Sequence, residues 1–279
     1  MNLLGIIEEI EKADPEFQDR ISPRRAAIRN ITSFGSKVAV AALPFAFSTL
    51  FKKAYGQTAT VPVNDVLNFA LKLEYLEAAF YNAGVASSLA FSATEKSYLT
   101  TIQGHENAHV AFLKTVLGSA AVAQTTQGTN GIYDFTASGT FPTVLSNVDI
   151  YFAVAQAFED TGVRAYKGQA PNLVGNQVVL TAALNIHSVE ARHASAVRLI
   201  RRLRGATTTK PWITGANDTG ITAVNANYAG EDNVNQGGVT ITSLAGVSGN
   251  VSINTATEGF DEPLTSAQVV ALVAPFGVK

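Results

Sequence analysis

The sequence predicts an all-α fold: a four-helix bundle with one long connection between its second and third helices. Three observations support this prediction. Four long segments place apolar residues at helical spacing, a glycine stands near the end of each, and two pairs of segments repeat the same polar positions. Short links within each pair favour antiparallel hairpins, and a long link between the pairs lets the second hairpin cross over the first.

Composition limits the classes of protein to be considered. The 279 residues are 47% hydrophobic and 15% charged, which is typical of a packed globule and not of a disordered chain. The sequence has no cysteine, so disulfides and thiolate metal sites are excluded. A net charge of −2 gives no reason to expect a nucleic acid or an anionic membrane as a partner.

Residues 1–57 read as a separate N-terminal extension. Arg24 and Arg25 precede the apolar run 38–51, which is the arrangement of an export signal, and paired arginines favour the twin-arginine route. We therefore expect an exported protein, periplasmic or at the cell surface, whose membrane contact is limited to this segment. The alternative is a retained helical extension, with a basic surface helix followed by a buried one.

The first bundle helix is expected from about Asn64 to Gly84. Its predicted inner face consists of Leu67, Leu71, Glu74, Ala78 and Tyr81. The second helix is expected from Ser92 to Gly118. Ser92 and Glu95 have the spacing of a capping box, which satisfies free backbone N–H groups at a helix start.

The third helix is expected from near Ser146, with Asp149 three residues on, to Gly168. The fourth is expected from about Gly175 to Gly205. Its last turns contain four arginines whose charges oppose the negative end of the helix dipole: Arg198, Arg201, Arg202 and Arg204.

The other segments complete the predicted organisation. Residues 119–145 are rich in Gly, Thr, Ser and Gln, have no helical period and form the long crossover. The bundle is expected to span residues 58–205, and an irregular Thr/Asn/Gly-rich tail to span 206–279. The tail contains short alternating pieces typical of minor β structure, and its end, FDEPLTSAQVVALVAPFGVK, predicts a turn and a short helix packed on the bundle.

Two of the predicted helices contain the pattern Glu-x-x-His, which places a carboxylate and an imidazole on one helix face, one turn apart. These pairs are Glu106 with His109 and Glu190 with His193. A carboxylate and a neutral imidazole placed in this way can bind one metal ion together.

Further polar residues repeat at the same spacing around both pairs. In each hairpin a glutamate of the first helix lies 32 or 31 residues before the glutamate of the pair, and a tyrosine lies seven residues after that first glutamate. The repeated residues are Glu74, Tyr81 and Glu106 in one hairpin and Glu159, Tyr166 and Glu190 in the other. Two such hairpins packed face to face would offer four carboxylates and two imidazoles, the ligand set for two divalent metals in a four-helix bundle.

Iron or manganese is the expected metal, with zinc as a contaminant, because carboxylates with imidazoles suit these ions and no thiolate is present. Burying six ionisable groups without a metal would be costly in desolvation. Glu77, one turn beyond Glu74, is an alternative ligand, but only Glu74 has a tyrosine at the repeated spacing. His105 and His187 are expected to be surface histidines or hydrogen-bond partners near the site.

The residues of this constellation resemble a known family. LNFALKLEYLEAAFY, HENAHVAFL, AFEDTGVRAY and SVEARHASAVR are similar to the ferritin-like domain family that includes the plant desiccation-related proteins, within the ferritin-like di-metal carboxylate superfamily. The tail GFDEPLT…VVALVAPF is also similar to the end of that family. The resemblance implies that Glu106 and Glu190 bridge two metals, that Glu74 and Glu159 each hold one, and that the two histidines complete the set.

The resemblance also implies alternative functions. One is an exported di-iron or di-manganese oxidoreductase, acting on dioxygen or hydrogen peroxide as an oxidase, peroxidase or catalase. The other is a structural or stress-protective protein of the envelope or matrix, with an envelope partner or a second copy, in which metals only staple the bundle. The extension and the long tail depart from compact storage ferritins, which argues against cage assembly and bulk iron storage.

The two repeated tyrosines are predicted to support the ligands. Two turns of helix place Tyr81 and Tyr166 about 10 Å along the axis from the glutamate of their own helix, too far for contact. Since a buried phenol needs a partner and a ligating carboxylate needs a donor to orient it, we expect each hydroxyl to donate to a ligand glutamate on another helix. The alternative is two core aromatics with solvent-facing hydroxyls.

Overall fold

The computed structural model describes residues 61–124, 133–216, 218–246 and 249–279. The predicted export signal and N-terminal extension, residues 1–57, lie outside these ranges. Within the described ranges, no helix combines the length and the apolar character needed to cross a membrane.

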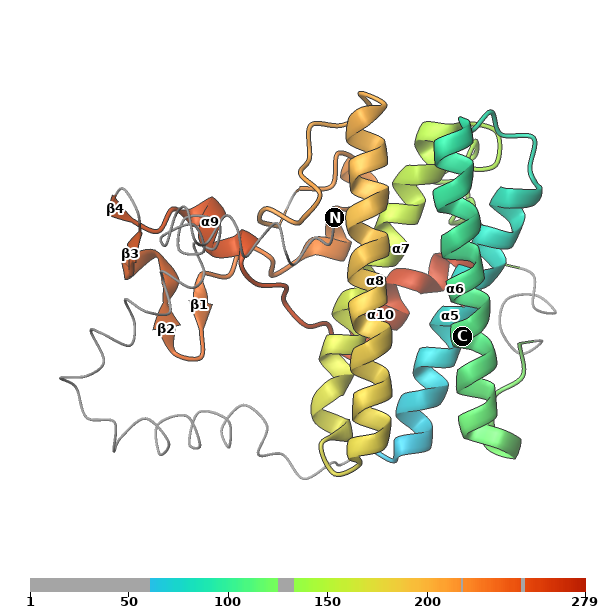
Figure 1. The fold of residues 1–279 in the computed structure, drawn as a ribbon, viewed down its shortest axis with the longest axis horizontal. Coiled ribbons are helices and arrows are strands. Elements are labelled where there is room, and N and C mark those ends of the chain that lie inside the picture. Colours follow the sequence, from blue (N-terminus) through green and yellow to red (C-terminus); the bar gives the residue numbers. More distant parts are fainter. Residues whose placement is uncertain (1–60, 125–132, 217, 247–248) are drawn as a thin grey trace, which may run out of the picture. The chain divides into compact units, whose positions relative to one another are not determined.

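Four long helices form the bundle, as the sequence predicts. They are α5 (Val63–Ala86), α6 (Ala93–Leu117), α7 (Val148–Gln169) and α8 (Gln177–Leu203). Helices α5 and α6 pack as one hairpin and α7 and α8 as the other, and the four lie side by side in Figure 1. The predicted inner face of the first helix, from Leu67 to Tyr81 at helical spacing, is buried.

Shorter elements fill the links and the tail. They are η1 (Gly118–Ala120), η3 (Ala170–Leu173), η4 (Thr222–Tyr228), β1 (Asn235–Gln236), β2 (Val239–Thr240), η5 (Ile241–Ser243), β3 (Ala245–Gly246), β4 (Gly249–Asn250), α9 (Ile253–Glu258), α10 (Ser266–Val273) and η6 (Ala274–Phe276). β1 pairs with β2, and β3 with β4, in two antiparallel two-stranded sheets. The minor β content expected of the tail is therefore confirmed.

The starts of α6, α7 and α8 are capped by polar side chains. The capping box of Ser92 and Glu95 is confirmed at the start of α6. Helix α7 begins two residues later than expected, because the side chain of Asn147 accepts hydrogen bonds from the N–H groups of Asp149 and Ile150. Asn176 caps α8 in the same way, accepting from the N–H of Val179.

Of the four glycines that suggested helix ends, two follow a helix and two lie inside one. Gly118 and Gly205 follow their helices with positive φ, as a helix end requires. Gly84 and Gly168 instead lie inside α5 and α7. A side-chain carbon at Gly84 would overlap the Tyr151 ring, and one at Gly168 would overlap the carbonyl of Leu264. These two glycines allow close packing, which local sequence does not reveal.

The core between the helices extends to the crossover and the C-terminal helix. Phe80 stacks on Tyr151 with ring centroids 4.4 Å apart, and Phe158 meets Phe276 edge to face at 4.7 Å. The N–H of Asp134, in the crossover, donates to the carbonyl of Phe276 over 3.0 Å. The predicted C-terminal helix is α10, which packs against α7, so bundle and tail share one core.

Arg164 on α7 fastens the tail to the bundle from inside. Its side chain is 1% exposed and its Nε lies 2.8 Å from Oε1 of Glu231. Its guanidinium also donates to the carbonyls of Glu262 at 2.7 Å, Ala229 at 2.6 Å and Asn227. One buried cation thus joins two separate stretches of the tail, residues 227–231 and Glu262.

Two arginines near the C-terminal end of α8 also bind the tail, a contact that the helix-dipole interpretation does not predict. Arg198 and Arg201 are 0% and 2% exposed. Arg198 binds Asp160 of α7 at 2.9 Å and Asp218 of the tail at 3.2 Å, while Arg201 donates to the carbonyl of Thr219 at 2.8 Å. Both side chains turn inward because the tail presents acceptors there.

Candidate metal centre

The structure brings the six predicted ligands together at the centre of the bundle. Their ligand atoms form two groups, each with all atoms within 4.8 Å of one another. One group is Glu74, Glu106, His109 and Glu190, and the other is Glu106, Glu159, Glu190 and His193. Glu106 and Glu190 belong to both groups, which is the position that the family resemblance implies for bridging ligands.

Each helix contributes one turn to this centre. Helices α6 and α8 each supply a glutamate and a histidine one turn apart on the buried face, and α5 and α7 each supply one glutamate. All four carboxylates are 0% exposed, so every one lies fully out of water. Charged groups are left in such surroundings only when paired or bound to a metal.

Three of the four carboxylates are not fully satisfied by hydrogen bonds among the described residues, whereas both oxygens of Glu74 have partners. Both oxygens of Glu106 and of Glu190, one oxygen of Glu159 and Nδ1 of His193 are buried without a hydrogen-bond partner there. Nδ1 of His193 lies 2.9 Å from Oε1 of Glu106 and 3.3 Å from Oε2 of Glu159, but not in hydrogen-bond geometry. Lone-pair donors that converge in this way fit divalent cations, which carboxylate and imidazole ligands suit.

Burial also perturbs the proton affinities of the cluster. Burial and the neighbouring Glu190 raise the pKa of Glu106 to about 7, and burial raises the pKa of Glu159 well above its usual range. Burial opposes the charged form of His109, but the three carboxylates around it raise its pKa to about 12. Without a metal, the cluster must therefore retain protons near neutral pH.

Metal affinity is expected to rise with pH. A protonated carboxyl or imidazolium must lose its proton before it can bind a cation, so protons and metal compete. Below the pKa of about 7 of Glu106, the dissociation constant for Mn²⁺ should fall about tenfold per pH unit for each proton displaced. Since His109 retains its proton to higher pH, the affinity for Mn²⁺ should continue to rise above pH 7. Calorimetric titration between pH 6 and 8 measures this, and an affinity independent of pH would contradict it.

The predicted tyrosine contacts are confirmed. The hydroxyl of Tyr81 on α5 donates to Oε1 of Glu159 on α7. The hydroxyl of Tyr166 on α7 donates to Oε1 of Glu74 on α5 over 2.5 Å. The two bonds cross the bundle in opposite directions, so the two hairpins are related by an approximate two-fold arrangement at the centre.

Replacement of either tyrosine by Phe should weaken metal binding about tenfold or more and leave the fold intact, because the carboxylate loses the donor that orients it. The measurement is Mn²⁺ affinity by titration, with thermal unfolding of the metal-free protein as the check on folding. Tyr151→Phe, a buried tyrosine of α7 whose hydroxyl contacts the carbonyl of Phe80, is the matched control. Equal Mn²⁺ affinity in Tyr81→Phe, Tyr166→Phe and the parent would show that the tyrosine hydroxyls do not orient the ligand carboxylates.

His105 is a partner of a predicted ligand, and His187 is not. Nδ1 of His105 lies 2.9 Å from Nε2 of His193, and the two rings stack with centroids 5.1 Å apart. This contact leaves Nδ1 of His193 facing the carboxylates and extends the centre to the protein surface, where His105 is exposed. His187 is half-buried, hydrogen-bonds the backbone of Val163 and joins neither ligand group.

Glu77 lies beside the centre without joining either ligand group, in agreement with the preference for Glu74. Glu77 is 5% exposed. Its burial, together with repulsion from the surrounding carboxylates, raises its pKa well above the usual range. On α7 the matching position is Gly162, where a side-chain carbon would stand 3.3 Å from Oε1 of Glu77. The sequence gives no signal for this pairing, because it depends on two helices meeting.

Comparison with known proteins agrees with this architecture. A family model described as a ferritin-like domain matches residues 63–202, about half of the chain and nearly all of the four long helices. Searches of curated proteins and of solved structures gave no match.

Proposed function

The chain belongs to the ferritin-like domain family. We propose that its buried cluster binds two ions of iron or manganese, and that the protein is an oxidoreductase that acts on dioxygen or hydrogen peroxide. The observation that supports this most is the set of four fully buried carboxylates in two overlapping ligand groups, three of which have oxygens without a hydrogen-bond partner among the described residues. Such a set is costly without cations and suits iron or manganese once they bind.

Each residue of the centre has a distinct role in this proposal. Glu74 and His109 would hold one ion, Glu159 and His193 the other, and the two shared glutamates would contact both. Bound iron or manganese would supply the electrons that reduce the oxidant. The protein's part is to fix the ligands, to exclude water by burial, and to hold carboxylate orientation.

The hydrogen bonds of the centre supply that orientation. The phenolic protons of Tyr81 and Tyr166 are directed at Oε1 of Glu159 and Oε1 of Glu74, which orients the second oxygen of each carboxylate toward the centre. His105, at the surface, contacts the ring nitrogen of His193 that points away from the carboxylates. With Nδ1 of His105 as the acceptor, His193 would donate from Nε2 and keep its Nδ1 free to bind.

A second candidate is a structural or stress-protective protein of the envelope, in which the metals only staple the bundle. The buried arginines that bind the tail favour an elaborate and stable fold beyond what a small catalytic bundle needs. In that case removal of metal should lower the stability and no turnover should be measured.

One experiment separates the two candidates. The full chain is produced with added iron and manganese, its metals are quantified by elemental analysis, and consumption of dioxygen and of peroxide is then measured. Two ions per chain with turnover support the oxidoreductase, and bound metal without turnover supports the structural function. A protein that binds no transition metal under these conditions would contradict both.

Export remains a proposal that rests on the paired arginines and the apolar run of residues 1–57. A metal loaded before export would explain a route that moves folded proteins. Cell fractionation should find the protein outside the cytosol, and Arg24→Lys with Arg25→Lys should retain it inside. Protein confined to the cytosol in both forms would refute export.

A further inference from the structure

A cavity of about 170 Å³ lies between α6 and α8, near the metal centre. Its mouth is formed by Phe112, Val116 and Val178, which are 41%, 45% and 81% exposed. Its inner end is formed by Leu67, Tyr166 and Ala183, which are buried. All of its lining residues are Leu, Phe, Val, Ile, Ala or Tyr, so the cavity leads from solvent into the bundle along hydrocarbon.

The inner end of this cavity lies about one helical turn from the ligands. On α6, the lining residue Leu113 follows His109 by four positions, and on α8, Ile186 precedes Glu190 by four. Four residues correspond to about 6 Å along a helix. Tyr166 joins the two regions directly, because its ring lines the cavity and its hydroxyl donates to Glu74 over 2.5 Å.

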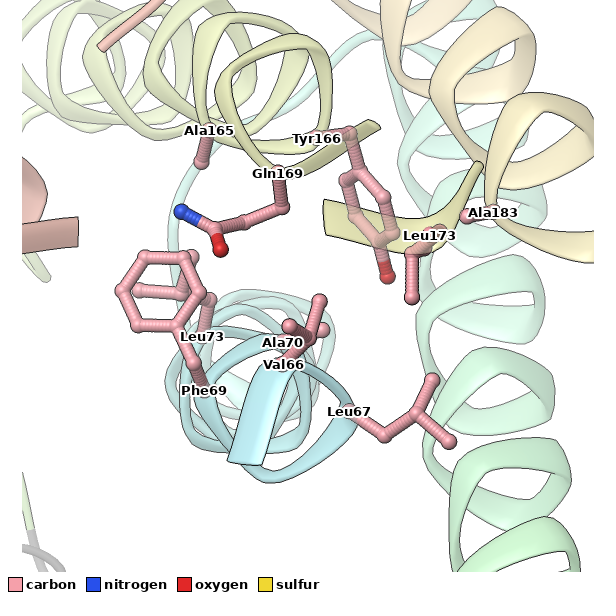
Figure 2. Close-up of a pocket in the computed structure, with 10 residues that line it drawn as sticks. All are labelled: Val66, Leu67, Phe69, Ala70, Leu73, Ala165, Tyr166, Gln169, Leu173 and Ala183. Carbon is pink, nitrogen blue, oxygen red and sulfur yellow. The ribbon is translucent and has the colours of Figure 1, made fainter. Parts of the chain in front are cut away.

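A smaller cavity of about 20 Å³ lies between α5 and α7 and shares three lining residues with the larger one. Figure 2 shows Tyr166, Leu67 and Ala183, which line both cavities, together with the side chain of Gln169 directed into the smaller one. The larger cavity has no such amide in its wall.

The lining chemistry selects the kind of molecule that the larger cavity can hold. An apolar cavity of about 150 Å³ in another protein stays dry and binds benzene or xenon, because its walls offer water no hydrogen bonds. Hydrogen peroxide would lose its hydrogen bonds to water on entering, at a cost of a few kcal/mol. A small uncharged apolar molecule loses nothing comparable.

We propose that the cavity between α6 and α8 is a binding and entry site for small apolar molecules, and that dioxygen reaches the metal centre through it. The assignment of dioxygen rests on the proposed oxidoreductase function, whereas binding of an apolar molecule does not. Tyr166 then serves as the wall between the cavity and the carboxylates. The ligand set is compatible with dioxygen and with hydrogen peroxide, and the apolar cavity favours dioxygen.

The binding site is tested with xenon on the full chain, without added metal. Xenon bound to crystals under pressure should be found in the cavity of the parent. Ala182→Phe, which adds a ring at the half-buried lining position of α8, should displace it. Ala111→Phe, the same change at an exposed position of α6 that does not line the cavity, should retain it. If Ala182→Phe does not fold, Ala182→Leu takes its place. No xenon in the parent, or equal xenon in both variants, overturns the site.

The entry role is tested on the same variants loaded with ferrous iron. Oxidation of the iron by dioxygen should be at least several-fold slower in Ala182→Phe than in Ala111→Phe, while oxidation by peroxide should be equal in the two. Equal dioxygen rates would overturn the entry role. A parent that binds xenon and reacts with peroxide but not with dioxygen would overturn the entry role alone. A parent that binds xenon but reacts with neither oxidant would overturn the proposed oxidoreductase and still support the apolar binding site.

Discussion

Glu106→Gln and Glu190→Gln should each remove both metal ions, whereas Glu74→Gln and Glu159→Gln should each leave about one ion per chain. The reason is geometric: Glu106 and Glu190 belong to both ligand groups, while Glu74 and Glu159 belong to one each. A glutamine retains the shape of the side chain but lacks the charge that a divalent cation requires. The measurement is the number of metal ions per chain, by elemental analysis after dialysis.

Glu77→Gln is the matched control for this series. Glu77 is buried beside the same centre and on the same helix as Glu74, but it belongs to neither ligand group, so both ions should remain. Equal metal content in Glu106→Gln and Glu77→Gln would show that the shared position is not a ligand.

Arg164→Met should lower the free energy of unfolding by about 3–5 kcal/mol, the typical cost of breaking a buried ion pair by removing one partner. The change leaves Glu231 buried without its cation and removes the donor from three tail carbonyls. Burial already raises the pKa of Glu231 to about 7 despite the arginine, so an uncompensated charge there is costly. Denaturant unfolding of the full chain measures the loss.

Two further variants distinguish a buried pair from a general effect of losing an arginine. Arg204→Ala breaks the partly exposed pairs with Glu95 and Asp149 and should cost only about 0.2–1 kcal/mol for each pair. Arg164→Met combined with Glu231→Gln should recover part of the stability, because the remaining partner is then neutral. A loss in Arg164→Met no larger than in Arg204→Ala would mean that the tail does not depend on this contact.

The sequence by itself determined what depends on neighbours along one helix. The four helices, the capping box of Ser92 and Glu95, and the Glu-x-x-His faces all follow from spacings of three or four residues. The repeat of a glutamate and a tyrosine seven residues apart even predicted contacts across the bundle. It did so because two hairpins of the same layout must meet face to face to bury the same groups.

Only the tertiary structure decided what depends on the approach of two distant segments. Gly84 and Gly168 read locally as helix ends, yet they are small because Tyr151 and the backbone of Leu264 pack against them. Arg198 read as a helix-dipole cation, yet it turns inward to Asp160 and the tail. From the sequence, His105 and His187 could not be told apart. Only the packing of α6 against α8 brings His105 into contact with His193. A spacing rule describes neighbours along one helix. The partner of a buried charge, or the group that requires a glycine, lies on a different segment, and the order of residues along the chain does not reveal which segments meet.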